Sequence, residues 1–174
     1  MHPDHDWFPI PFQYGPRFGK AMQVDAELRE LLRHGLYQDA LDLLVRRPDW
    51  PATRAVRALL RCYLLLGQDR VLESWKEAQA LEDPEHELFY SIGLKAQKRA
   101  YDEQNDEDRA AEILDAGLQA LTRALEVKAG AYWTLLAKSS LLRQKANLTG
   151  DKALLDEAER LNEQGRAMVP KPPS

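Results

Sequence analysis

Three arginines on one predicted helix are the side chains of this sequence best suited to hold a ligand. Arg54, Arg57 and Arg61 lie between Thr53 and Leu66, with no acidic residue among them. At about 100° per residue on a helix, their stripe lies roughly 130° from the centre of the apolar face, so the three cannot all point into a core. Because a guanidinium group can hold a carboxylate by two parallel hydrogen bonds, the stripe favours acidic or carboxylate-terminated ligands.

A similar excess of bases recurs later in the chain, between two acidic segments. Residues 130–148 carry three bases, Lys138, Arg143 and Lys145, and no acid. Residues 106–128 hold six acids against three bases, and residues 151–166 hold five against three. Two interpretations stay open. The bases line a groove for a ligand, or they pair with acids on adjacent helices and keep the surface hydrated.

Two other polar clusters resemble metal sites only in part. His2, Asp4, His5 and Asp6 offer ligands for a transition metal, but we expect no rigid scaffold around them. Residues 102–108 imitate the odd positions of a calcium loop without its glycine and its final glutamate, so we interpret them as an acidic turn that caps the next helix, with Asn105 as the N-cap. We expect no metal and no cofactor.

Catalytic motifs are missing from the sequence. It has no Gly-rich phosphate loop, no HExxH, no GxSxG and no cysteine pair with metal spacing, so we do not expect an enzyme. His34 and His86 fall at predicted helix ends, where capping explains them better than proton transfer. Asn147-Leu148-Thr149 matches the glycosylation sequon, but nothing in the sequence directs the chain to a secretory compartment.

Composition predicts an all-α protein. Of the 174 residues, 44% are apolar and 30% charged, and β-branched residues are scarce. The formal charge of -4 argues against a protein whose main task is binding nucleic acid, and the single cysteine, Cys62, excludes an internal disulfide. No window approaches the ~20 apolar residues of a membrane span, and no secretory signal is visible, so we expect no membrane partner and a cytoplasmic location.

Helix pairs must position these side chains. Residues 50–85 predict two helices joined at Gly67, with Pro51 and Pro84 marking helix starts. Four such pairs open near residues 21, 51, 84 and 129, at steps of about 30, 33 and 45 residues. Asn147 to Gly150 predicts the turn within the last pair. A hairpin of this kind cannot bury both faces alone, so each pair requires neighbours of its own kind.

Residues 1–20 and 170–174 differ from the helical region between them. Four prolines forbid a regular helix in the first segment, and six aromatic or aliphatic residues make it too apolar for a hydrated tail. We predict an extended N-terminal arm over residues 1–20 and an extended tail over residues 170–174. The arm caps its own first helix pair, docks on a neighbouring subunit, or binds a partner.

The helical region over residues 21–169 resembles the tetratricopeptide repeat family. Gly35-x-Tyr37-x-x-Ala40-Leu41 looks like that family's turn and second-helix opening, Gly67 lies 17 residues before Pro84, and Trp133-x-x-Leu136-Ala137 looks like its first-helix core. The resemblance implies an α-solenoid of about four stacked antiparallel hairpins. We expect a positive φ at Gly67. Leu72 departs from the family, because a small residue is expected there.

In that family the first helices line a concave groove. The resemblance therefore implies ligand-facing positions at Met22, Asp25 and Arg29, at Arg54, Arg57 and Arg61, and at Ala131, Thr134 and Lys138, and we add Lys95, Lys98 and Arg99 from the third pair.

The sequence thus predicts a non-enzymatic protein–protein interaction module, a scaffold whose basic groove binds an acidic or carboxylate-terminated peptide. The alternative is a self-associating helical repeat protein, homodimeric through its N-terminal arm and without a dedicated peptide ligand.

Overall fold

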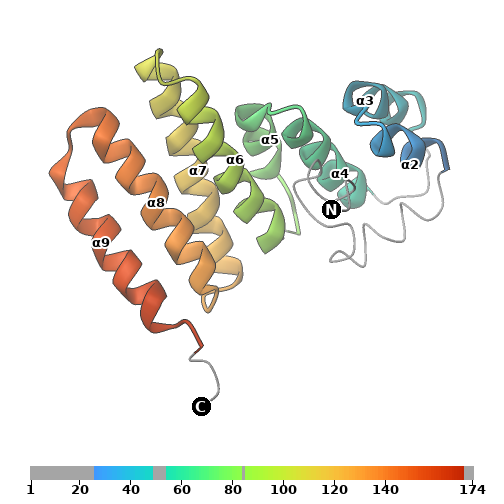
Figure 1. The fold of residues 1–174 in the computed structure, drawn as a ribbon. Helices are drawn as coiled ribbons and strands as arrows, with labels where there is room; N and C mark the ends of the chain where they lie inside the picture. The colour runs from blue at the N-terminus through green and yellow to red at the C-terminus, as the bar shows by residue number, and fades with distance from the viewer. Residues whose placement is uncertain (1–25, 49–53, 84, 171–174) are drawn as a thin grey trace. The chain divides into compact units, whose positions relative to one another are not determined.

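A computed structural model describes residues 26–48, 54–83 and 85–170 of the chain. In these ranges all regular structure is helical, which confirms the all-α prediction for them (Figure 1). The helices are α2 (Ala26–Arg33), α3 (Tyr37–Arg46), α4 (Arg54–Gly67), α5 (Val71–Ala78), α6 (His86–Asp102), α7 (Glu107–Val127), α8 (Tyr132–Thr149) and α9 (Lys152–Ala167). Across the described ranges, no helix is long and apolar enough to cross a membrane.

The chain divides into two compact units at residues 84 and 85. Unit 1 contains α2 to α5, and unit 2 contains α6 to α9. The predicted single repeat domain over residues 21–169 spans both units and stays a prediction. The predicted N-terminal arm and the last four residues of the tail lie outside the described residues.

Unit 1 consists of two helix hairpins, α2 with α3 and α4 with α5, that meet where α3 packs on α4. The central helix α4 is buried over almost its whole circumference from Leu59 onward. Its apolar surface therefore exceeds the one face that the sequence pattern indicated. An isolated α4–α5 hairpin would leave much of that surface in water, which is why a second hairpin is needed.

The turn between α2 and α3 is a Schellman motif. The N–H of Gly35 donates to the carbonyl of Leu32 at 3.0 Å, and the N–H of Leu36 donates to that of Leu31 at 2.8 Å. Gly35 has a φ of 67°, in the left-handed region that glycine adopts without steric cost. This turn reverses the chain so that α3 packs back on α2.

The same turn recurs 34 residues later between α4 and α5, with Asp69 in the place of Gly35. Asp69 has a φ of 58°, its N–H donates to Leu66 at 3.0 Å, and the N–H of Arg70 donates to Leu65 at 3.0 Å. The prediction of a positive φ at Gly67 is therefore wrong. Aspartate serves at this position because its short polar side chain tolerates the left-handed region better than most.

Gly67 is required for a different reason. A Cβ atom on Gly67 would lie 2.9 Å from the ring of Tyr37 on α3, so glycine admits that aromatic ring against α4. The 34-residue shift also aligns Ser74, not Leu72, with Ala40, and both side chains are fully buried. The Ser74 hydroxyl donates to the carbonyl of Cys62 at 2.9 Å across the hairpin. The small residue expected at position 72 is thus present two residues later.

Unit 2 consists of two longer hairpins, α6 with α7 and α8 with α9, and α8 packs on both α6 and α7 (Figure 1). The carboxylate of Asp106 caps α7 by accepting the N–H of Arg109 at 3.0 Å, so the cap predicted at Asn105 lies one residue too early. Helix α8 continues to Thr149 and ends at Gly150, whose φ is 72°. The turn predicted from Asn147 is therefore shorter than expected.

Glycine permits a close approach of three helices in unit 2. A Cβ on Gly117 of α7 would lie 2.5 Å from the Cβ of Ala96 on α6 and 2.7 Å from a methyl carbon of Leu141 on α8. The leucine end can rotate away, but the Cβ of Ala96 is fixed to the backbone. Any side chain at position 117 would therefore force α6 and α7 apart.

We predict that Gly117→Ala destabilises the protein although alanine is the better helix former. Overpacking of a core costs about 1–3 kcal/mol, against a helix-propensity gain of at most about 1 kcal/mol, so a net loss of roughly 1–2 kcal/mol is expected. Urea denaturation followed by circular dichroism measures it. Gly130→Ala is the control, because nothing lies within 4 Å of a Cβ there. Equal stability of the two variants would contradict the proposed close contact.

Candidate functional site

The guanidinium of Arg57 is held by hydrogen bonds at the end of α3. Its guanidinium donates to the carbonyls of Arg47 at 2.5 Å and Pro48 at 2.9 Å, and also to the carbonyl of Leu44. The last carbonyls of a helix have no partner within the helix, and a cation is favourable beside them because of the helix dipole. Arg57 therefore joins α3 to α4, which limits its use for a ligand.

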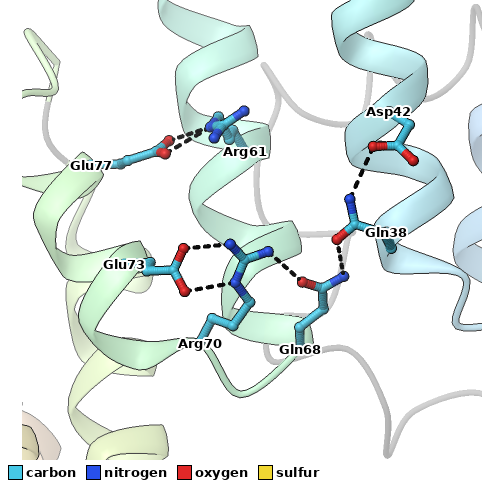
Figure 2. A network of polar contacts seen from close by, with 7 residues as sticks. All are labelled: Gln38, Asp42, Arg61, Gln68, Arg70, Glu73 and Glu77. Atoms are coloured by element: carbon cyan, nitrogen blue, oxygen red, sulfur yellow. Dashed lines mark hydrogen bonds and ion pairs between the residues drawn. The ribbon is translucent and has the colours of Figure 1, made fainter.

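Arg61 is paired with an acid on the second helix of its own hairpin. Its Nε donates to the two carboxylate oxygens of Glu77 on α5 at 2.7 and 2.8 Å (Figure 2). Arg54 and Arg29 are exposed, and no contact of either guanidinium is seen with another described residue. Unit 1 thus does not present its predicted arginines as one unpaired stripe.

A chain of polar contacts links α3 to α5 beside this ion pair (Figure 2). Gln68 donates to Gln38 at 3.3 Å, Arg70 donates to Gln68 at 2.9 Å, and Arg70 binds Glu73 through Nε at 2.8 Å and also through Nη2. The hydrogen bonds raise the pKa of Arg70 and lower the pKa of Glu73. These contacts hold the α4–α5 turn against α3.

Unit 2 contains an open hollow of about 500 Å³ between α6 and α8. Each helix contributes four residues at the spacing i, i+3, i+4 and i+7, which lie on one face of a helix. The lining residues are Leu94, Gln97, Lys98 and Tyr101 on α6, and Ser140, Arg143, Gln144 and Asn147 on α8. The two sets are 46 residues apart at every position, as are the first residues of the two helices.

Direct hydrogen bonds join the two helices at this hollow. The amide of Gln97 donates to the hydroxyl of Ser140 at 2.6 Å, and the amide of Gln144 donates to the carbonyl of Gln97 at 3.3 Å. Helices α6 and α8 are therefore joined along the floor of the hollow. The site is preformed.

The hollow combines two cations with exposed apolar groups. Lys98 and Arg143 are exposed and form no ion pair with any described residue. Leu94 and Tyr101 leave 42% and 65% of their surfaces in contact with solvent. Such a surface can attract a carboxylate and at the same time bury an apolar side chain of the same ligand.

The other residues predicted for unit 2 lie elsewhere. Lys138 lies about 170° around α8 from the hollow, Lys95 is half-buried on a different face of α6, and Arg99 pairs with Glu103 one turn along α6. Ala131 and Thr134, implied as ligand-facing, are fully buried. Of the eight basic residues predicted to bind peptide, only Lys98 lines the hollow. The stripe of four residues on α6 recurs 46 residues later on α8. This repetition is the signal in the sequence that could have located Arg143 and the other lining residues.

Acids on second helices do pair with bases on first helices. Lys145 of α8 binds the carboxylate of Asp115 on α7, as Arg61 of α4 binds Glu77 on α5. Ion pairs within the α4–α5 hairpin and between α7 and α8 therefore explain part of the charge asymmetry of the sequence. At the hollow, Lys98 and Arg143 form no such ion pair with any described residue.

His86 and Cys62 are buried titratable side chains. His86 on α6 exchanges a 2.9 Å hydrogen bond with the Thr134 hydroxyl on α8, and its ring stacks on that of Tyr90. Burial lowers the pKa of His86. Burial also raises the pKa of Cys62, to about 12, which leaves the thiol protonated and unreactive. Across the described ranges, no group of His, Cys, Asp and Glu is arranged to hold a metal.

We predict that His86 makes unit 2 sensitive to acid. Desolvation and Lys128 lower its pKa in the folded protein, and Glu87 opposes them. Because the unfolded histidine, with a pKa of about 6.5, takes up its proton first, this stability is full above about pH 6.5 and is lost as the pH falls through the lower folded pKa. His86→Gln should lose less stability than the wild type between about pH 7.5 and 5.5.

The exposed His34, which contacts Glu30 at 2.8 Å, provides the matched control for that measurement. His34→Gln should follow the wild type in urea denaturation at both pH values. An equal pH dependence for the wild type and His86→Gln would exclude His86 as the source.

We predict that Arg57→Ala destabilises unit 1 by about 1–2 kcal/mol, because it leaves the last carbonyls of α3 without their charged donor. Arg54→Ala, one turn earlier and exposed, should change the free energy of unfolding by less than about 0.5 kcal/mol. Urea denaturation of the two variants measures the difference. If both are as stable as the wild type, Arg57 has no structural role.

Comparison of the chain with protein-family models, with curated proteins and with solved structures finds no match.

Proposed function

We propose that this protein is a protein–protein interaction module of tetratricopeptide-like helix hairpins that binds an acidic or carboxylate-terminated peptide segment. The repeated Schellman turn, 34 residues apart in unit 1, and the small residues Ala40 and Ser74 at matching positions support the repeat assignment. Within unit 2, α8 packs on both helices of the preceding hairpin, as stacked repeats do.

The observation that carries the proposal is the hollow between α6 and α8. It presents Lys98 and Arg143 without acidic partners among the described residues. Arg143 can hold a carboxylate by two hydrogen bonds, whereas Lys98 acts as a compact point charge. The amide of Asn147 can bond the peptide backbone, and Leu94 and Tyr101 offer apolar contact.

Arg57 and Arg61 are not among the residues proposed to hold the ligand. Both are held by intramolecular contacts in unit 1, so charge reversal there would remove a helix cap and an ion pair as well as any ligand contact. A loss of peptide binding in those variants could therefore reflect a loss of structure. The residues of the hollow allow a cleaner test, because neither Lys98 nor Arg143 bonds another described residue.

We predict that Lys98→Glu/Arg143→Glu weakens binding of a fluorescein-labelled peptide of alternating glutamate and leucine by tenfold or more. Two lost attractions and two new repulsions, each worth about 0.5–1 kcal/mol, are sufficient for that change. Fluorescence anisotropy measures the affinity. Binding by the wild type should weaken with salt, since the Debye length is about 10 Å at 0.1 M.

Lys152→Glu/Arg160→Glu is the matched control, because it changes the net charge equally at two exposed positions of α9. It should leave the affinity within about twofold of the wild type. Equal weakening in both double variants would show a non-specific effect of net charge and would overturn the proposed site. Unchanged circular dichroism must accompany the loss.

A further inference from the structure

The side chains that line the hollow between α6 and α8 supply positive charge and hydrogen-bond donors but no acid. Lys98 and Arg143 provide two positive charges, and neither forms an ion pair with a described residue. Ser140 accepts the hydrogen bond from Gln97 and keeps its own O–H as a donor. The other polar lining side chains also carry donors, and they are Gln97, Tyr101, Gln144 and Asn147. The hollow therefore matches, in charge and in donors, a compact dianion with several acceptor oxygens.

The two cations lie at nearly the same height on opposite walls of the hollow. Helices α6 and α8 run in the same direction (Figure 1), and their lining residues correspond at an interval of 46 residues, which places Lys98 level with Gln144. Arg143 precedes Gln144 by one residue, a rise of about 1.5 Å. The hydrogen bond from Gln144 to the carbonyl of Gln97 joins the immediate neighbours of the two cations. One anionic group between the walls can therefore meet both charges.

Several carboxylates along a peptide fit this arrangement less well. In an extended peptide that lies along the hollow, acids on the same side are two residues apart, or roughly 7 Å, so only one of them reaches both cations. Asp102 also follows Lys98 by one turn of α6, outside the lining of the hollow. A second acid of the ligand on that side would be repelled. The geometry favours one group with two charges over two groups with one charge each.

We propose that the hollow between α6 and α8 binds a phosphorylated side chain of a partner protein. This inference rests on the proposed function, because it names the acidic group that the interaction module recognises. A phosphorylated residue carries a charge of about −1.5 to −2 at pH 7 and three acceptor oxygens, whereas a carboxylate carries one charge and two oxygens. Arg143 holds two of the phosphate oxygens through its fork, and Lys98 approaches from the other wall.

The residues beside the phosphorylated side chain are apolar. On α6, Leu94 and Tyr101 lie one turn before and one turn after Lys98, and they expose 42% and 65% of their surfaces. Apolar side chains on either side of the phosphorylated residue remove this surface from water. An inorganic phosphate ion would pair with the cations and leave the surface exposed. The ligand is therefore a peptide segment and not the free ion.

Three fluorescein-labelled peptides of alternating leucine and serine test the proposal on the full chain. The central position is phosphoserine in the first peptide, glutamate in the second and serine in the third. Fluorescence anisotropy at pH 7.5 should show that the phosphoserine peptide binds about tenfold or more tighter than the glutamate peptide, and that the serine peptide binds most weakly. Equal affinities for the phosphoserine and glutamate peptides would overturn the inference.

Competition distinguishes a peptide from the free ion. The unlabelled phosphoserine peptide should displace the labelled one at concentrations about tenfold or more below those of inorganic phosphate, because only the peptide covers Leu94 and Tyr101. Equal competition by inorganic phosphate would overturn the recognition of a peptide.

The pH dependence of binding provides a second readout. The second pKa of a phosphate monoester is about 6, so about a quarter of the phosphoserine is dianionic at pH 5.5 and nearly all of it at pH 7.5. If the hollow binds the dianion, the affinity for the phosphoserine peptide should rise about fourfold between these pH values. The glutamate peptide stays ionised over this range, so it controls for effects of pH on the protein, including protonation of His86. An equal change for the two peptides would overturn the inference.

Lys98→Gln/Arg143→Gln locates the binding. It removes both charges without adding repulsion, and it should abolish the preference for the phosphoserine peptide over the glutamate peptide. Lys152→Gln/Arg160→Gln changes the net charge equally at two exposed positions of α9 and should keep that preference. A preference that survives in Lys98→Gln/Arg143→Gln would place the phosphate elsewhere and would overturn the inference.

The glutamate–leucine peptide separates this inference from the proposed function. If that peptide binds at the hollow and phosphoserine brings no gain, the inference fails and the proposed function stands. If only the phosphoserine peptide binds, the inference stands and the proposed function narrows to phosphorylated segments. If neither peptide binds, both are wrong.

Discussion

The meeting of three helices at Gly117 determines the geometry of unit 2. The backbone of α7 approaches Ala96 of α6 and Leu141 of α8 so closely that no side chain fits at this position. Because Ala96 of α6 and Leu141 of α8 both pack against Gly117 of α7, this contact fixes the separation of α6 and α8. Gln97 and Ser140, the neighbours of Ala96 and Leu141 in sequence, then meet at 2.6 Å and form the floor of the hollow. A packing constraint inside the unit thus sets the width of a surface feature.

In unit 1, the bases Arg57 and Arg61 stabilise the fold. Its hairpins are short, α5 having only 8 residues, and a short helix buries too little apolar surface to be stable by itself. Arg57 supplements that burial by donating to the carbonyl of Leu44 near the end of α3 and to those of Arg47 and Pro48 just beyond it, and Arg61 does so by pairing with Glu77 on α5. Exposed ion pairs contribute little individually, whereas donors to otherwise unpaired carbonyls contribute more. The basic stripe of α4 is therefore explained mainly by stability.

The sequence was sufficient to predict the helical class and the approximate starts of the helix pairs, because apolar periodicity and prolines encode both. It did not predict the register of the contacts. Gly67 suggested a left-handed turn, but that conformation belongs to Asp69, and Gly67 instead admits the ring of Tyr37. A glycine required by packing looks the same in a sequence as one required by φ, so only the three-dimensional neighbours distinguish the two.

The same limitation explains why the sequence indicated Arg57 and Arg61 as ligand-binding residues, whereas the structure indicates Lys98 and Arg143. Most arginines on the exposed faces have an acid one turn away, as in the pairs of Arg70 with Glu73, Arg99 with Glu103, Arg109 with Glu112 and Arg123 with Glu126. Arg143 has Ala146 and Asn147 at those positions, and α8 contains no acid at all. A cation without a local acid keeps its attraction for an anion from elsewhere. Local acids alone do not decide this, since Arg61 has no acid one turn away and pairs with Glu77 on α5, whereas Lys98 has Asp102 one turn along α6 and forms no ion pair with any described residue. The pairing of charges in three dimensions, rather than their number along a helix, therefore indicates which bases are available to a ligand.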